Sequence, residues 1–255
     1  AIGLTFVAVQ ELGLFDSYWQ TVAIQLFMFG VLALSWDLLG GQTGYPSFVL
    51  IAFFGVGAYT AAVLLKDYAV GLPVALLAAG VAALIFGAVI GGVVLRLRGG
   101  YFAIATLGVT LAGQQVATNL EVTGGSSGRI LFDVSQQVTY YYGLLALLLV
   151  EVALLYYLSG TRFGYTLNAI RDDEDKAISM GVNTTYYKTA AWMVAALFTG
   201  LAGGLWAPYN KFVDPNAAMS AAWNVELIVM AFLGGTGTIA GPVIGAFSLR
   251  SITLQ

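Results

Sequence analysis

Apolar residues fill long stretches of this chain, and charged residues divide them into windows. The windows without any Asp, Glu, Lys or Arg cover residues 17–36, 38–65, 68–95, 99–120, 189–210 and 227–249. A seventh window, 137–159, contains a single acid, Glu151. About 20 mostly apolar residues are needed to cross a hydrocarbon core roughly 30 Å thick. The pattern therefore predicts an all-α, polytopic transmembrane helix bundle with about eight spans.

The composition supports this interpretation. Of the 255 residues, 59% are hydrophobic and 9% are charged, and the mean hydropathy is +0.86. A soluble fold of this size has too little interior to hide so much apolar surface, so lipid is the expected solvent. Residues 1–10 are too short to span, and we interpret them as the end of another helix or an interfacial segment. No basic region indicates a signal peptide there.

Several function classes are excluded by the residues that are missing. The chain has no cysteine and no histidine, which removes disulfides, thiolate chemistry, imidazole metal ligands and Ser-His catalysis. None of its four lysines follows a glycine as Gly-Lys-[Ser/Thr] requires, so the chain is not itself an ATPase. A net charge of −3 argues against a nucleic-acid partner. We therefore expect no enzyme activity, no cofactor and no bound metal.

The few basic residues orient the predicted bundle. Arg96 and Arg98 follow one apolar window, and further basic residues lie in the polar segment at 160–188. Cytoplasmic loops of membrane proteins carry an excess of Lys and Arg. Because the windows 99–120 and 137–159 separate the two groups, both groups are predicted on the cytoplasmic side, with the loop between those windows outside.

Glycine is concentrated in two places, one in each half of the chain. The first is G-G-Q-T-G-Y-P-S-F at 40–48, and the second is A-F-L-G-G-T-G-T-I-A-G-P-V-I-G-A at 231–246. Gly and Pro weaken a helix, and the freed backbone groups then need partners in the protein or in a water-lined cavity. The alternative is that these glycines only allow close helix packing. Clustering in both halves favours two broken helices, as in transporters whose binding site lies between internal repeats.

The longest polar segment, 160–188, holds eight of the 23 charged residues. Its apolar residues follow approximate helical spacing, with charges on the other side, at Phe163, Leu167, Ile170, Ala177 and Met180. This spacing predicts one short amphipathic helix.

The ends of that helix are marked by capping residues. Thr161 is expected to cap its start and Gly181 its end, with Asn183 as a further stop signal. The apolar stripe needs a cover. The membrane interface, the ends of neighbouring helices and a separate soluble subunit are the three candidates.

At these residues the segment resembles the cytoplasmic coupling region of ABC importer permeases, where a Glu-Ala-Ala-x-x-x-Gly pattern docks on the ATPase. Asp175, Lys176, Ala177 and Gly181 fill those places here, so the pattern is imperfect. The run R-F-G-Y-T-L-N-A-I-R-D-D-E-D-K-A-I-S-M-G-V-N is similar to permeases of branched-chain amino acid (LIV-type) importers. Further stretches resemble that family in the same order, at 44–63, 95–107, 198–207 and 233–246.

The chain departs from the family in the first glycine cluster. Between Gly44 and Ala52 the family has a Ser-Leu-Gly-His type of run, whereas this chain has Pro-Ser-Phe-Val-Leu at 46–50. This stretch is a candidate lining of the translocation pathway, so the departure bears on which substrate is carried.

The resemblance implies a single transmembrane permease domain over residues 1–255, with a cytoplasmic coupling loop at about 160–188. Its expected partners are a second homologous permease, two ATPase subunits and an extracytoplasmic substrate-binding protein, in the cytoplasmic membrane. The ATPase contacts are then predicted at Arg162, Arg171, Glu174, Asp175, Ala177 and Gly181. Without a partner, the charges among them would form ordinary pairs on a solvated helix face.

An amino acid in transit needs weak partners for its carboxylate, its ammonium group and its side chain. Hydroxyl groups and exposed backbone amides at the broken helices suit this need, and helix N-termini favour an anion. The pathway residues are predicted to be Thr43, Tyr45, Ser47, Thr60, Glu226, Thr236 and Thr238.

Two acids lie near membrane depth, where an unpaired carboxylate is costly. Glu226 matches an acid in the family's N-V-E-L type of stretch, which favours a structural or gating role. Glu151 faces a neighbouring helix or is protonated. Two readings stay open beside a hydrophobic amino acid permease: a LIV-type permease for urea, short amides or other amino acids, and a membrane scaffold that transports nothing.

Overall fold

The computed structural model of the chain describes residues 17–131 and 136–253, and nearly all of them are helical. In chain order the longer helices are α2 (Ser17–Asp37), α3 (Leu50–Asp67), α4 (Leu72–Val94), α5 (Gly100–Asn119), α6 (Gln137–Ser159), α7 (Arg162–Asp172), α9 (Thr184–Asn210), α11 (Ala221–Gly234) and α12 (Ala240–Thr253). The shorter elements are the π-helical turn η1 (Leu38–Gln42), the 3-10 turns η2 (Glu121–Thr123) and η3 (Gly125–Ser127), the helices α8 (Glu174–Ser179) and α10 (Pro215–Ala218), and the strands β1 (Arg129–Ile130) and β2 (Phe212–Val213).

Six helical segments of the described chain are long and apolar enough to cross a membrane. They are Tyr18–Gln42, Leu50–Asp67, Leu72–Val94, Gln137–Ser159, Thr184–Asn210 and Pro215–Gly234. The predicted all-α polytopic bundle is therefore confirmed, and the expected count of about eight approximates these six. The interpretation of residues 1–10 lies outside the described residues.

Two apolar windows do not each form one apolar spanning helix, and for 227–249 this agrees with the break predicted at 231–246. Window 99–120 forms α5, which is long enough but is not one of the six apolar segments. Window 227–249 does not form one spanning helix, because α11 ends at Gly234 and α12 begins at Ala240. Gly235, with φ of +102°, ends α11 in a conformation that side chains rarely adopt.

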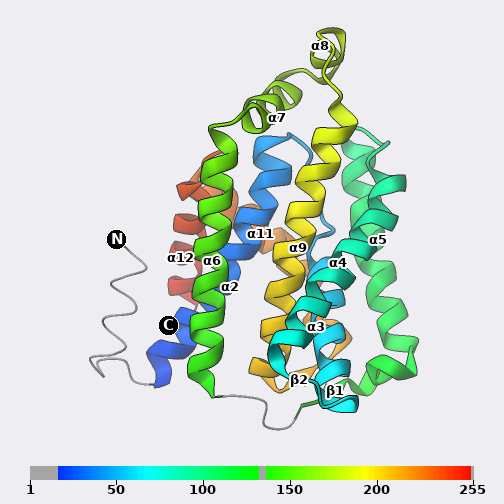
Figure 1. The fold of residues 1–255 in the computed structure, drawn as a ribbon, viewed down its shortest axis with the longest axis vertical. Helices are drawn as coiled ribbons and strands as arrows, with labels where there is room; N and C mark the ends of the chain where they lie inside the picture. The colour runs from blue at the N-terminus through cyan, green and yellow to red at the C-terminus, as the bar shows by residue number, and fades with distance from the viewer. Residues whose placement is uncertain (1–16, 132–135, 254–255) are drawn as a thin grey trace.

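The bundle is organised around α9 and α2, which stand side by side in Figure 1. Helix α9 packs against α3 and α4, whereas α2 packs against α6, α11 and α12. The outer face of α4 carries exposed Val74, Leu77, Val81, Ile85, Val89 and Val93 at helical spacing. A one-sided apolar stripe of this length suits lipid contact.

Helices α3 and α9 approach each other through glycine. A Cβ placed on Gly57 would lie 2.7 Å from the carbonyl carbon of Gly200, and one placed on Gly203 would lie 2.8 Å from that of Phe54. Small residues of this kind let helix backbones come together in membranes. Close packing is therefore the role of these two glycines.

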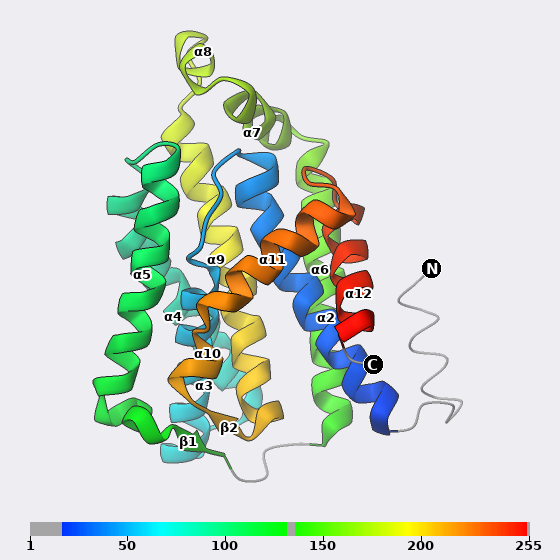
Figure 2. The same ribbon diagram turned by 180° about the vertical axis from the view of Figure 1, so that it is seen from behind.

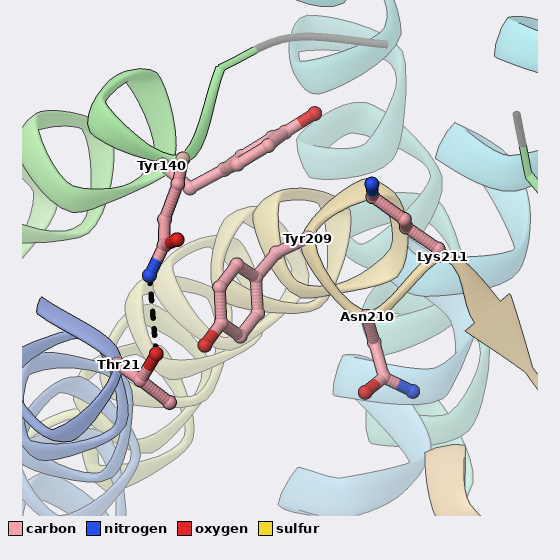
Figure 3. A pocket seen from close by; sticks show the side chains of 6 residues that line it. Thr21, Tyr140, Tyr209, Asn210 and Lys211 are labelled. Carbon is pink, nitrogen blue, oxygen red and sulfur yellow. Dashed lines mark hydrogen bonds between the residues drawn. The ribbon is translucent and has the colours of Figure 1, made fainter. Parts of the chain in front are cut away.

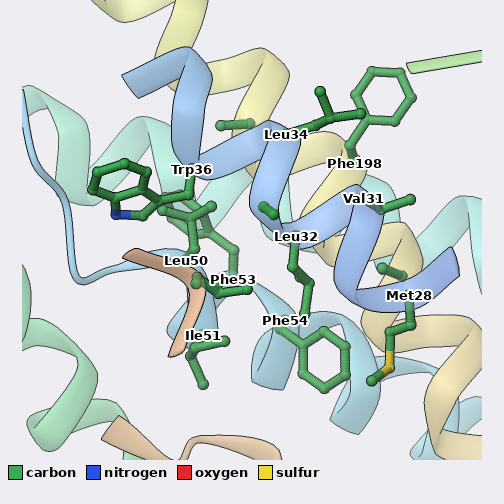
Figure 4. Packing of buried hydrophobic residues seen from close by; sticks show 14 of the residues in the cluster. Met28, Val31, Leu32, Leu34, Trp36, Leu50, Ile51, Phe53, Phe54 and Phe198 are labelled. Carbon is green, nitrogen blue, oxygen red and sulfur yellow. The ribbon is translucent and has the colours of Figure 1, made fainter. Parts of the chain in front are cut away.

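Large side chains fill the centre of the bundle beside this contact. Figure 4 shows Leu32 of α2 directed toward Phe54 of α3. The ring of Phe53 meets that of Trp192 edge-on, with centroids 5.2 Å apart, and Trp192 Nε1 donates to the Gly87 carbonyl oxygen at 2.8 Å. The indole nitrogen thus has a partner although its side chain is buried.

The two ends of the bundle differ in structure. At one end β1 and β2 pair antiparallel, with Arg129 opposite Val213. At the other end α7 and α8 project beyond the long helices (Figure 1). Arg98 lies at the α8 end too, where its Nη1 is 2.7 Å from Asp175 Oδ1. The prediction that the two basic regions share one side of the membrane is consistent with this ion pair.

Candidate functional site

The polar segment folds as two helices, so the prediction of one continuous helix is wrong. Helix α7 ends at Asp172, and α8 begins at Glu174. Between them Asp173 is extended, with φ −165° and ψ 103°, and its side chain accepts the N–H of Lys176 at 3.0 Å. This bond lowers the pKa of Asp173. Asp is a favoured N-cap residue, so a second helix starts here.

The outer boundaries agree with the predicted caps. Thr161 Oγ1 accepts the N–H of Phe163 at 3.2 Å and caps α7. Gly181, with φ +85°, follows α8, and the N–H of Val182 reaches back to the Ala177 carbonyl at 3.1 Å. Asn183 is different from the prediction. Its side chain accepts the N–H of Tyr186 at 3.1 Å, so it starts α9 rather than stopping α8.

The apolar stripe of the segment is covered by the chain itself. Leu167, Ile170 and Ala177 are buried, and Phe163 packs on the ring of Tyr187. Helix α7 contacts α6, α9 and η1. The cover is therefore the ends of neighbouring helices, and the stripe as a whole does not need a soluble subunit. Met180 alone among the five stripe residues stays fully outside, with 85% of its surface exposed.

The six predicted ATPase contacts separate into two groups. Arg162, Asp175 and Gly181 are exposed, as a docking surface requires. Ala177 is buried and the Glu174 side chain is only 11% exposed, so these two face the bundle. Arg171, at 40% side-chain exposure, also reaches inward. Three of the six predicted residues therefore lie on the outer surface of the loop, and the other three face the bundle.

Glu174 is the centre of a polar cluster that we call the Glu174 cluster: Tyr45, Arg98, Glu174 and Lys188. Tyr45 Oη donates to Glu174 Oε2, and Lys188 Nζ lies 2.6 Å from Glu174 Oε1. Lys188 Nζ also donates to Tyr45 Oη at 3.3 Å, and Arg98 Nε lies 3.7 Å from Glu174 Oε2. Burial alone would raise the pKa of Glu174, but the hydrogen bonds from Lys188 and Tyr45 hold it below its usual value. The carboxylate is therefore ionised, and each of its two oxygens accepts a hydrogen bond.

A second set of contacts joins the two broken helices. Arg171 Nη1 donates to the Gly41 carbonyl oxygen at 3.1 Å, in the turn that ends α2. One turn earlier, Asp37 Oδ1 accepts the N–H of Gly237 at 2.8 Å, from the loop between α11 and α12. Asp37 is 1% exposed. The two glycine clusters, about 200 positions apart in sequence, therefore meet beside the end of α7.

The first break is confirmed and leads back into the bundle. Figure 2 shows the chain leaving the top of α2 and running down beside the helices before α3 begins. Ser47 lies in this segment and is fully buried, and its carbonyl accepts Trp36 Nε1 at 3.0 Å. Thr43 is buried as well, and its hydroxyl donates to the Leu39 carbonyl. In this conformation Thr43 and Ser47 help to satisfy the broken backbone.

The second break is also confirmed, between Gly234 and Ala240. Thr238 Oγ1 donates to the Gly235 carbonyl at 2.9 Å and accepts the N–H of Gly241 at 3.1 Å. Thr236 lies half-buried in the same loop. These two threonines are thus close to the first break through the Asp37–Gly237 contact.

Three acids and hydroxyls named from the sequence lie away from this junction. Thr60 is within α3, where it donates to its own helix at the Val56 carbonyl (2.7 Å). Glu226 of α11 pairs with Arg250 of α12 at 3.4 Å. Glu151 is 1% exposed and accepts the Ser35 hydroxyl at 2.7 Å, across the α2–α6 contact. Thr60 and Glu226 thus lie within the halves of the broken helices, and neither is brought to the breaks themselves.

A polar cavity lies at the opposite end of the bundle, with a volume of about 270 Å³. Figure 3 shows Tyr209, Asn210 and Lys211 at the end of α9 around it, and Gln137 Nε2 donating to Thr21 Oγ1 at 3.1 Å. Tyr209 therefore lines this cavity, at the end of the bundle that is predicted to be outside. Within residues 17–131 and 136–253, no three His, Cys, Asp or Glu side chains are grouped to hold a metal.

Sequence reasoning missed three residues that the structure brings into the site. Arg98 and Lys188 were used only to orient the chain, although Lys188 closes the polar segment in Y-Y-K. Asp37 appeared only as the charge between two apolar windows. A lone acid between two spans, next to a glycine cluster, is the signal that identifies Asp37.

Comparison with known proteins gives one family over almost the whole chain. The family model described as branched-chain amino acid transport system / permease component matches residues 18–253. The high-affinity branched-chain amino acid transport system permease protein LivM of Salmonella typhimurium is 29% identical over 89% of this chain and 61% of its own length. A probable LivM of Methanocaldococcus jannaschii is 24% identical over 88% of this chain and 78% of its own.

A more limited match is found with a different transport system. The autoinducer 2 import system permease protein LsrC of Yersinia pseudotuberculosis is 34% identical, over 48% of this chain and 34% of its own length. The chain spans about 61% of the length of the LivM proteins of Salmonella typhimurium and Escherichia coli.

Proposed function

The chain belongs to the family of branched-chain amino acid transport permease components, and from this premise we propose that it is the membrane subunit of an ABC importer for branched-chain or related hydrophobic amino acids. The observation that carries the proposal is the junction at one end of the bundle. There α7 and α8 present exposed residues outward and contact the first broken helix inward, and Asp37 of that helix binds the loop of the second. A permease driven by a soluble ATPase needs both of these faces.

The outward face is the proposed ATPase-docking surface. It consists of Arg162, Asp175, Gly181 and the apolar Met180, all exposed. An exposed apolar side chain within a charged rim is typical of a contact that buries on binding. Two ATPase subunits would dock on this permease and on a second homologous permease. This arrangement puts α7 and α8 in the cytoplasm and the chain in the cytoplasmic membrane.

The inner face is the proposed gate. Residues 43–49 lie in the bundle without helical structure, between the end of η1 and the start of α3. Movement of this segment would free the hydroxyl groups of Thr43, Tyr45 and Ser47 together with backbone amides. Thr236 and Thr238 would line the same region from the second break, and residues 1–255 would act as one permease domain. Groups that bind weakly and in several positions suit a transient passage.

An assay of coupled hydrolysis tests the proposal. The permease is reconstituted in nanodiscs with its two ATPases and sister permease, and ATP turnover is measured with leucine-loaded binding protein. We expect stimulation by the loaded binding protein. Asp175→Arg, on the docking surface, should abolish it, whereas Glu121→Arg, an equal charge reversal on an exposed residue at the opposite end, should retain it. Absence of stimulation by any solute would support a scaffold instead.

A second candidate function is a LIV-type permease for urea, short amides or other amino acids. The run Pro-Ser-Phe-Val-Leu at 46–50 departs from the family and leaves the solute open, and the LsrC match favours a solute other than a branched-chain amino acid, since that relative is named as an autoinducer 2 import permease. Uptake into proteoliposomes separates the candidates. Leucine, isoleucine and valine should compete with one another, whereas competition by urea, short amides or other amino acids alone would favour the second candidate.

A further inference from the structure

We propose that Glu174 is a positioning residue that ties residues 43–49 to α8, so that a movement of α8 carries this segment with it. The inference rests on the proposed function. It says which part of the permease moves when an ATPase displaces α8, namely residues 43–49. It also separates Glu174 from the ATPase contacts, because its side chain faces the bundle.

Three separate parts of the chain meet at the two oxygens of Glu174. Oε2 accepts from Tyr45 of the broken segment, and Oε1 lies 2.6 Å from Nζ of Lys188, near the start of α9. Lys188 closes the triangle by donating to Tyr45 Oη at 3.3 Å, with Nζ 4.5 Å from the ring centroid. The side chains of Glu174 and Lys188 are 11% and 6% exposed. Charge-assisted bonds at such sites are stronger than bonds on a solvated surface.

The segment that Tyr45 belongs to has little internal support. No regular helix forms between Gln42 and Leu50, and the Tyr45 N–H reaches back to the Leu39 carbonyl at 3.0 Å. The ring of Tyr45 meets that of Phe102 edge-on, with centroids 5.2 Å apart. A segment without its own helical bonds takes its position from tertiary contacts of this kind. The contact with Glu174 connects this segment to α8.

Helix α8 is a short helix with a hinge residue at each end. It has six residues, with extended Asp173 before it and left-handed Gly181 after it. Hinges are a few element-terminal residues that absorb backbone changes. The Asp175 side chain is 80% exposed and lies next to Glu174, and Arg98 contacts both acids, at 2.7 Å and 3.7 Å. A partner that displaces the outer face of α8 therefore displaces Glu174 too.

The chain has no cysteine, so a single introduced thiol reports on the segment. Ser47→Cys is the reporter, because Ser47 is 0% exposed here. The complete complex is labelled with a water-soluble maleimide, without nucleotide and after trapping with ATP and vanadate. We expect the two rates to differ by about tenfold, within the range usual for coupling between sites. Glu174→Gln and Tyr45→Phe should reduce the ratio to about one.

Asp172→Asn is the matched control, since it also neutralises an acid of the loop but at a side chain that is 74% exposed. It should keep the ratio of the unaltered chain. A merely structural role for Glu174 would change both labelling rates alike and leave their ratio. Tyr45→Phe removes one hydroxyl only, so it decides the matter if Glu174→Gln fails to assemble.

Stimulated ATP turnover is measured on the same samples to separate the two proposals. Stimulated turnover together with an unchanged labelling ratio in Glu174→Gln and Tyr45→Phe would overturn the role of Glu174 and leave the importer intact. A ratio of one in the otherwise unaltered chain, with turnover still stimulated, would overturn it as well. Loss of stimulation in the unaltered chain would instead refute the proposed function.

Discussion

Replacement of Gly57 by alanine tests whether α3 and α9 depend on backbone contact. Gly57 faces the backbone of Gly200, and an added Cβ would lie 2.7 Å from its carbonyl carbon and 2.8 Å from its Cα. Backbone atoms cannot rotate away as a side chain does. The helices must therefore separate, and the buried rings beside them, such as Phe53 against Trp192, lose their contact.

The size of the effect follows from two opposing terms. Alanine is about 1 kcal/mol better than glycine inside a helix. Overpacking costs about 1–3 kcal/mol, and the upper part of this range applies because the obstructing atoms are backbone. We expect a net loss in the free energy of unfolding of about 2 kcal/mol. For a chain of this length, that corresponds to a Tm lower by about 4–8 °C.

Thermal unfolding in detergent, followed by the fluorescence of the five tryptophans, measures this shift. Gly92→Ala in α4 is the control, because a Cβ there meets nothing within 4 Å; its Tm should stay or rise. Gly203→Ala obstructs the same interface at Phe54. The double variant with Gly57→Ala should lose less than the two single losses together, since the helices separate once. Equal Tm values for Gly57→Ala and Gly92→Ala would refute the reasoning.

Three further predictions concern single contacts. Arg171→Gln removes the bond to the Gly41 carbonyl and should speed backbone hydrogen exchange in residues 38–42; unchanged exchange would mean that the bond does not hold the turn. Trp192→Phe leaves the Gly87 carbonyl without its buried partner and should cost about 1–3 kcal/mol, seen as a lower Tm. Because the pKa of Glu174 is lowered in the folded state, its stabilising contribution is complete above the ordinary value of 4.5 and is lost as the pH falls below it. The Tm difference between the unaltered chain and Glu174→Gln should therefore be constant from about pH 5 to 8 and shrink at lower pH. A difference that grows on acidification would contradict this.

Patterns local to the chain predicted the fold class well. Long charge-free windows such as 68–95 and 189–210 became spanning helices because only a helix satisfies its own backbone in lipid. The glycine clusters were recognised as breaks for a related reason, since a helix rich in Gly is easily interrupted. Thr161 and Gly181 were recognised as caps because a cap is made within a few residues.

Charge counting and apolar spacing each overlook a second local signal in the same stretch of chain. Charge counting treats 227–249 as one window, but the backbone turn at Gly235 divides it into two helices. Apolar spacing in 160–188 suggested one helix, yet Asp173 caps a second one within it. For the cover of the apolar stripe the sequence left three candidates open, and the tertiary structure selects the ends of the neighbouring helices α6 and α9.

The sequence by itself determined that this chain is a helical membrane permease of a known family, because hydropathy, helix breaks and ordered motifs each depend on short stretches of neighbouring residues. Only the tertiary structure decided which residues meet. Asp37 binds the Gly237 amide and Glu174 binds Tyr45, across 200 and 129 positions of the chain. No pattern within a short stretch of sequence could predict contacts between residues so far apart in the chain. They follow from how the helices pack: Glu174 joins α8 to the segment after α2, and Asp37 joins the two breaks.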